Sequence, residues 1–271
     1  LILFSTYSAL TLGQAWDEGH LTKQGQITLN YLLSLGKLDE SIFRREYYSP
    51  IYYSLKYLFL QTFPMKYQVE ANHLVNLIFS FGVIFGIKQL CKELFNKKIA
   101  NITFLVLFFF PAFHGHMSFN SKDTIIAFCH VWIFYSLIKY LKNQSMDQSS
   151  KYFYNIGILS AVGTGINLFF LGSLIPVFLF TIYEVFFAKK ICNKNFKKKF
   201  FLIDTLKSFL IFYILLVIFW IDTHPNIIIL PFKLFLEWAF TDLWRGYPFI
   251  LINGDYFVYK EIPKSYLITN F

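Results

Sequence analysis

The chain has 271 residues, a net charge of +9 and few charged side chains for its length. Asp, Glu, Lys and Arg make up 15 % of it, against about 25 % in an average soluble protein. Hydrophobic residues make up 56 % and only three residues are cysteines, which excludes a disordered, a collagen-like or a disulfide-rich chain. A membrane protein is the class that these numbers favour.

Segments without a charged residue predict where the chain crosses the membrane. A helix needs about 20 largely apolar residues to span a hydrocarbon core of ~30 Å. The charge-free segments are residues 71–87, 99–121, 124–138, 152–183 and 208–221. We expect the second of them to provide a span over 99–113. The prediction is an all-α, polytopic transmembrane bundle with long outer loops that contain interfacial helices.

The 152–183 segment is too long for a single span. Extended to residue 188, it predicts two short spans or a re-entrant hairpin. Its expected break points are residues that weaken a helix, namely Gly163, Gly165, Gly172 and Pro176. Residues 1–13 are expected to end one further helix and residues 266–271 to begin another. We therefore expect a single transmembrane domain over 1–271 that is a fragment, truncated at both ends.

Lysine-rich loops predict the orientation of the chain. Thirteen of the 25 basic residues lie in three loops, residues 88–98, 139–151 and 189–199. Because loops rich in Lys and Arg stay on the cytoplasmic side, the other connections should face outward. These outer segments are residues 14–70, 114–122 and 222–264. Anionic headgroups account for the positive charge, so we expect membrane lipids and no nucleic acid as partners.

The first outer segment opens with two acidic residues just after a span, within residues 16–20 (WDEGH). Charged groups are costly at a membrane and mark candidate sites. Partial desolvation raises the pKa of a carboxylate, so Asp17 or Glu18 would suit a general base acting on a hydroxyl group. The alternative is that Asp17 caps an interfacial helix over residues 21–35. The tyrosines of residues 47–53 suit the headgroup level, with stacking on a sugar as the second interpretation.

The second outer segment is residues 114–123 (HGHMSFNSKD). Asn120 or Ser121 is expected to cap the helix that follows. Lys122 then stands at a helix N-terminus, where an ammonium group opposes the helix dipole unless an anion is also bound. A lysine at a helix N-terminus suits a phosphate, although an ordinary interfacial lysine is an equal alternative. His116 would add a hydrogen bond to the phosphate.

The third outer segment contains Arg245, the only arginine outside residues 44–45. Its planar guanidinium suits phosphate, and a salt bridge to Asp242 is the alternative. Asn253-Gly254 predicts a tight turn, in the manner of a hairpin. The sequence holds no P-loop and no G-x-G-x-x-G, so no nucleotide cofactor is expected.

These residues together resemble the GT-C membrane glycosyltransferases, in the branch of the protein O-mannosyltransferases and the bacterial lipid A aminoarabinose transferases. The Asp17-Glu18 pair after the first span is typical of that branch. Residues 119–123 (FNSKD) resemble its F-x-N-P-K-D run, with serine in place of proline. Residues 251–254 (LING), followed by 261–263 (EIP), resemble its L-F-N-G and L-P stretch. The similarity runs in order over nearly the whole chain.

The resemblance implies a GT-C-like helical fold and a hexosyl or pentosyl transferase that uses a polyprenyl-phosphate-linked sugar donor. The acceptor would be a hydroxyl group of a lipid, glycan or protein, on the periplasmic or outer face of a bacterial inner membrane. Asp17 would be the general base with Glu18 beside it, and Lys122 would contact the donor phosphate. Arg245 or His116 would also contact the phosphate, an expectation that comes from the chemistry of these side chains and not from the resemblance. A divalent metal held by carboxylates and His20 remains open.

Two other classes of protein compete with this interpretation. A lipid or glycolipid transporter, or flippase, predicts charged residues within spans and internal repeats. A non-catalytic membrane assembly protein predicts that the acidic pair and the lysine lie apart and tolerate substitution.

Overall fold

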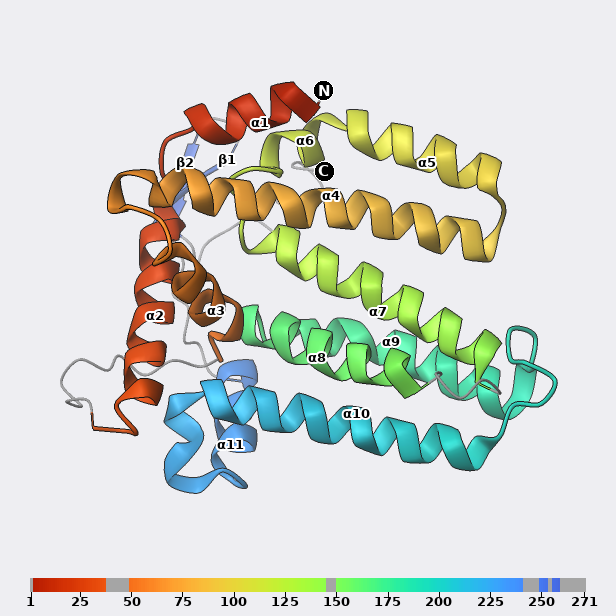
Figure 1. Ribbon diagram of the computed structural model, residues 1–271. Helices are drawn as coiled ribbons and strands as arrows, with labels where there is room; N and C mark the ends of the chain where they lie inside the picture. The colour runs from red at the N-terminus through yellow and green to blue at the C-terminus, as the bar shows by residue number, and fades with distance from the viewer. Residues whose placement is uncertain (1, 38–48, 145–149, 241–248, 253–254, 259–271) are drawn as a thin grey trace. The chain divides into compact units, whose positions relative to one another are not determined.

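The computed structural model describes residues 2–37, 49–144, 150–240, 249–252 and 255–258 (Figure 1). Its internal contacts divide the chain into two compact units, residues 1–227 and 228–271, and each is described by itself. The expectation of a single domain over 1–271 stays a prediction.

The first unit is built from helices. They are α1 (Ile2–Thr11), α2 (Trp16–Leu33), α3 (Ile51–Leu60), α4 (Gln68–Leu94), α5 (Lys97–Phe109), α6 (Pro111–His116), α7 (Asp123–Asn143), α8 (Ser150–Ile166), α9 (Phe169–Tyr183) and α10 (Lys198–Phe219). Short helical turns add η2 (Met65–Tyr67), η3 (Glu184–Ala188) and η4 (Ile221–Asn226). In Figure 1, α4 and α5 form one antiparallel pair, and α7, α8 and α10 lie next to one another in turn.

Four helical segments of the described chain are long and apolar enough to cross a membrane. They are Met65–Leu94, Asp123–Asn143, Phe169–Ala188 and Lys198–Phe219. Each overlaps a segment that lacks charged residues or nearly lacks them. The prediction of a helical protein is confirmed, and these four segments support the expectation of a membrane protein.

The expected span over 99–113 is wrong in its length. Helix α5 ends at Phe109 because Phe110, which precedes Pro111, is extended with φ −68° and ψ 113°. Pro111 then takes the first position of α6, where its missing N–H leaves no bond unmade. The 13 residues of α5 make a helix of about 20 Å, which is shorter than a bilayer core.

The long apolar segment does form two helices, α8 and α9. The break lies after Ile166, where the Asn167 side chain accepts a hydrogen bond from the backbone N–H of Phe169 at 3.0 Å. All four expected break points lie inside helices, Gly163 and Gly165 in α8 and Gly172 and Pro176 in α9, so they were wrong. Gly165 serves packing instead, because a Cβ there would lie 2.2 Å from the carbonyl oxygen of Ser49.

The three lysine-rich loops meet at one end of the first unit. Lys139 pairs with Glu93 at 3.1 Å, which joins the end of α7 to the end of α4. The Gln144 side chain donates to the carbonyl oxygen of Lys197 at 2.9 Å. The backbone N–H of Asn193 donates to the carbonyl of Leu141 at 3.0 Å. These contacts agree with the prediction that the three loops share one side of the membrane.

The second unit contains α11 (Leu230–Phe240) and a two-stranded antiparallel hairpin, β1 (Phe249–Ile252) with β2 (Asp255–Val258). Ile252 pairs with Asp255, so two residues connect the strands. The predicted hairpin is confirmed by these strands, and its turn, 253–254, lies outside the described residues.

Candidate functional site

Helix α2 begins at Trp16, five residues before the expected start. Asp17 and Glu18 therefore lie in its first turn, and the idea that Asp17 caps the helix is wrong. The residue before the helix is Ala15, which has no capping side chain, and the Glu18 carboxylate accepts its backbone N–H at 2.8 Å. Both acidic residues lie at the positive end of the helix dipole, a position that suits acidic side chains.

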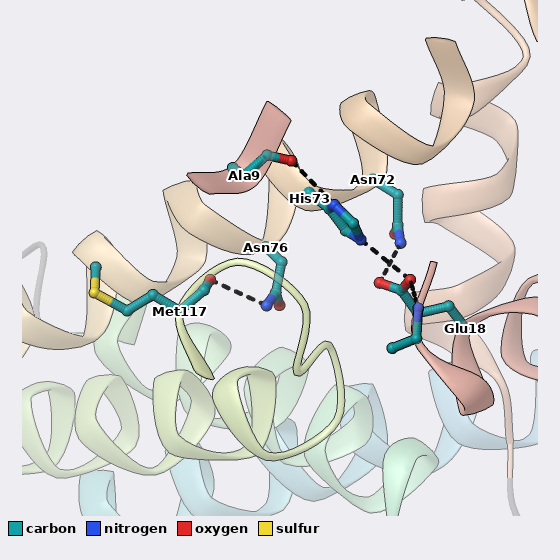
Figure 2. A network of polar contacts seen from close by, with 7 residues as sticks. Ala9, Glu18, Asn72, His73, Asn76 and Met117 are labelled. Atoms are coloured by element: carbon teal, nitrogen blue, oxygen red, sulfur yellow. Dashed lines mark hydrogen bonds and ion pairs between the residues drawn. The ribbon is translucent and has the colours of Figure 1, made fainter. Parts of the chain in front are cut away.

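The two neighbouring carboxylates have different surroundings. Consecutive residues of a helix point about 100° apart, so one can face the protein while the other faces outward. Asp17 is exposed, whereas Glu18 is only 3 % exposed. Glu18 Oε1 accepts a hydrogen bond from Asn72 Nδ2 at 2.9 Å, and its Oε2 contacts His73 Nε2 at 3.1 Å (Figure 2). Three protein groups thus hold Glu18, and Asp17 is left accessible.

His73 forms a buried pair with Glu18 in which the position of one proton is fixed. Its Nδ1 lies 3.0 Å from the carbonyl oxygen of Ala9, which can only accept, so Nδ1 carries a hydrogen. The proton between Nε2 and Glu18 belongs to one partner or the other. In both arrangements the pair has no net charge. The pair joins α1, α2 and α4 (Figure 2).

Helix α4 also holds the second outer segment through the same row of polar side chains. Asn76 lies one turn after Asn72, and its Nδ2 donates to the carbonyl oxygen of Met117 at 3.1 Å (Figure 2). Ser80, one turn further, donates to the same oxygen at 2.8 Å. We call Asn72, His73, Asn76 and Ser80 the polar row of α4. It ties Glu18 and Met117, from two predicted outer segments, to one helix.

In the second outer segment, the N-cap residue of α7 is Lys122 and not Asn120 or Ser121, although the Asn120 side chain does accept hydrogen bonds at the start of the helix. Its Oδ1 accepts hydrogen bonds from the backbone N–H of Asp123 at 3.0 Å and of Lys122 at 3.3 Å. Lys122 precedes the helix and its side chain is exposed. His116 is exposed as well and lies against the ring of Phe119, with centroids 5.4 Å apart. The side chains of Lys122 and His116 are thus both accessible, with His116 Nδ1 3.4 Å from the Asn120 amide nitrogen.

Some of the predicted site residues lie where the structure gives no description. Arg245, its alternative partner Asp242 and residues 261–263 lie outside the described residues, so the roles expected of them stay predictions. His20, named for a metal, is exposed and contacts the Gln24 amide at 3.0 Å. The described part of the chain contains no group of three or more His, Cys, Asp or Glu side chains that could hold a metal ion.

The structure adds a buried lysine that the sequence analysis passed over. Lys56 of α3 is 3 % exposed, and its ammonium lies 5.6 Å from the ring centre of Tyr52 and 5.4 Å from that of Tyr53. Burial lowers the pKa of Lys56 to about 8, against the opposing effect of the Glu18 charge. Burial raises the pKa of Tyr52. One signal was available, since Tyr52 and Lys56 are spaced i, i+4 on one helix face.

The candidate site thus combines an accessible carboxylate, Asp17, with a carboxylate that hydrogen bonds hold in place, Glu18. Helix α4, which holds Glu18, also holds the segment that contains Lys122. No protein-family model, curated protein or solved structure matches the chain. An accessible carboxylate and an exposed lysine thus lie on two segments that are both hydrogen-bonded to α4.

Proposed function

We propose that the protein is a membrane glycosyltransferase that moves a sugar from a polyprenyl-phosphate-linked donor to a hydroxyl acceptor. The observation that carries the proposal is the polar row of α4. It holds Glu18 of the first outer segment and Met117 of the second outer segment, which also contains Lys122. The resemblance of residues 17–18 and 119–123 to GT-C enzymes points to the same pair of segments.

In this proposal Asp17 is the general base. It removes the proton from the acceptor hydroxyl while the hydroxyl oxygen forms a bond to the anomeric carbon. The bond from that carbon to the phosphate oxygen breaks, and the lipid phosphate leaves with the electron pair. The proton ends on Asp17, and the configuration at the anomeric carbon is inverted.

Glu18 acts as a positioning residue in the proposed reaction. Its two oxygens already accept hydrogen bonds from Ala15 and Asn72 and contact His73. A carboxylate held in this way fixes the first turn of α2, and with it the direction in which Asp17 faces. Catalytic groups need such support, because a misplacement of about 1 Å can cost on the order of 100-fold in rate.

Lys122 is the proposed contact of the leaving phosphate, with His116 and Arg245 as further donors. A fixed cation stabilises the charge that develops on the phosphate as its bond to the sugar breaks. The site would face the periplasm from a bacterial inner membrane, because the lysine-rich loops gather at the opposite end of α4. The protein would then be a multi-pass membrane enzyme.

Transport is the second candidate, and the polar row of α4 is the feature that bears on it. Polar side chains within a membrane-spanning helix often line the path of a substrate. Here the hydrogen bonds of Asn72, His73, Asn76 and Ser80 run to other protein groups, so the row is suited to holding structure rather than to passing a solute.

A transfer assay separates these candidates. Membranes that contain the protein would be incubated with radiolabelled polyprenyl-phosphate sugars and acceptors, for the wild type, Asp17→Asn and Glu93→Gln. Glu93 is the matched control, because it is a carboxylate at the lysine-rich end of α4. Transfer by the wild type and Glu93→Gln, lost in Asp17→Asn, supports the proposal. Movement of the labelled lipid between leaflets without any transfer would support transport.

A further inference from the structure

Lys56 is a buried cation with no hydrogen-bond partner among the residues that the structure describes. Its ammonium nitrogen is inaccessible and makes no hydrogen bond, although it has three hydrogens to donate. The hydroxyl group of Tyr52, one turn before it, also lacks a partner. Two unpaired donors on one face of α3 are costly to bury, unless an acceptor takes them in some state of the protein.

Glu18 is not that acceptor. Its charge acts on both Lys56 and Tyr52, but no ion pair joins them within hydrogen-bonding distance. The oxygens of Glu18 are already occupied by Ala15, Asn72 and His73. The Glu18 carboxylate therefore leaves the Lys56 ammonium without an acceptor.

We propose that Lys56 and Tyr52 bind the phosphate group of a lipid phosphate beside Glu18. A phosphate has only acceptor oxygens, so it satisfies an ammonium and a phenol hydroxyl together. The two ring contacts hold the ammonium until a phosphate replaces them. The long lysine stem allows the ammonium to move several ångströms without a shift of the helix.

Exposed apolar residues of α3 explain why the phosphate should carry an apolar chain. Leu55 and Leu58 are each 52 % exposed and Phe59 is 46 % exposed, on the same helix that buries Tyr52 and Lys56. A helix with one apolar exposed side lies in a membrane interface. An amphiphile can then place its phosphate head at Lys56 and its apolar chain on these exposed residues, whereas inorganic phosphate gains nothing from them.

The inference rests on the proposed function and deepens it, since it adds a phosphate contact on α3 to the one expected at Lys122. Its test measures binding alone. The protein, in phosphatidylcholine nanodiscs, would be titrated with farnesyl phosphate, farnesol and inorganic phosphate. The variants are Lys56→Met, Lys56→Arg and Tyr52→Phe. The control is Lys66→Met, because Lys66 also lies over a tyrosine ring, 5.3 Å from that of Tyr67, but is exposed.

We expect farnesyl phosphate to bind more tightly than farnesol or inorganic phosphate. Lys56→Met should weaken its binding by about 10- to 100-fold, which is the effect of losing a charged hydrogen bond. Tyr52→Phe should weaken it by about 3- to 10-fold, while Lys56→Arg and Lys66→Met retain most of it. Unfolding temperatures would be measured for each variant, and Tyr52→Phe tests the site even if a lysine variant misfolds.

Equal binding of farnesyl phosphate by the wild type, Lys56→Met and Tyr52→Phe would overturn the inference. If inorganic phosphate bound as tightly as farnesyl phosphate, the inference that the ligand carries a lipid chain would be overturned. This result is distinct from that of the transfer assay. A protein that binds farnesyl phosphate through Lys56 but transfers no sugar would support the phosphate site and contradict the proposed glycosyltransferase activity.

Discussion

At the scale of single residues, the main finding is that Asp17 and Glu18 have different surroundings although they are neighbours. Glu18 is held by three groups from two other parts of the chain, and Asp17 is exposed. A carboxylate needed for structure and one available for chemistry should respond differently to the same substitution. Stability and activity can therefore be separated by two conservative variants.

Glu18→Gln should destabilise the protein by roughly 2–4 kcal/mol, because it breaks a buried pair and leaves donors unpaired. Asp17→Asn should change stability by less than about 0.5 kcal/mol, as expected of an exposed side chain. Thermal unfolding in detergent, followed by tryptophan fluorescence, measures both. Equal stability of the two variants would contradict the assignment of Glu18 as the structural member of the pair.

Lys56 should lower the stability of the unliganded protein. Its pKa is about 8 in the folded protein and 10.5 in a free side chain, so between these values the unfolded chain binds more protons. The free energy of unfolding should therefore rise as the pH increases from 8 towards 10. Below pH 8 the full cost of burying the charged ammonium should remain. Lys56→Met should unfold a few degrees higher at pH 7 and lose this pH dependence. A lower unfolding temperature for Lys56→Met would contradict the account.

At the scale of elements, close contact between helices fixes the site. Gly25 of α2 lies against α3, and a Cβ there would lie 2.2 Å from the carbonyl oxygen of Tyr53. This contact sets the distance between the helix of Asp17 and the helix of Lys56. The polar row of α4 sets the position of α2 through Glu18.

Gly25→Ala should push α2 away from α3 and lower stability by about 1–3 kcal/mol, the usual cost of overpacking. It should also weaken farnesyl phosphate binding, because Lys56 moves with α3. Gly19→Ala is the matched control on the same helix, since a Cβ there meets only the flexible end of Gln14 at 3.2 Å. Circular dichroism melts and the nanodisc titration test this prediction. A Gly25→Ala protein that matches Gly19→Ala in both would refute it.

Several elements could be predicted from the sequence, and the reasons are local. Charge-free segments mark α4, α7, α9 and α10, and the turn residues 253–254 mark the hairpin. The partners of Glu18 could not be predicted, because Asn72 and His73 are 54 and 55 residues away and lie in a segment taken as a plain span. Lys56 was missed because one lysine among tyrosines resembles an ordinary interfacial residue.

At the scale of the whole molecule, the three lysine-rich loops meet at one end of the first unit, away from the polar row of α4. The orientation that follows can be tested by cysteine labelling. The native thiol of Cys192 is a poor probe, since burial raises its pKa to about 11 and the charge of Glu184 adds to the effect. Two exposed lysines serve instead, Lys23 on α2 and Lys194 in a lysine-rich loop.

In a background without the native cysteines, Lys23→Cys should react with a membrane-impermeant maleimide in intact cells. Lys194→Cys should react only after the cells are permeabilised, because positively charged loops remain in the cytoplasm. Labelling of both sites in intact cells, or the reverse pattern, would contradict the proposed orientation of the candidate site.

The central claim is that Asp17 performs chemistry on a lipid-linked sugar, and single-turnover transfer by Asp17→Asn tests it most directly. Donor affinity and transfer rate would be measured on the same preparation. The account predicts an unchanged affinity and a rate lower by about 100- to 10,000-fold, which is the contribution of a general base. A transfer rate equal to that of the wild type would contradict the claim and remove Asp17 from the mechanism.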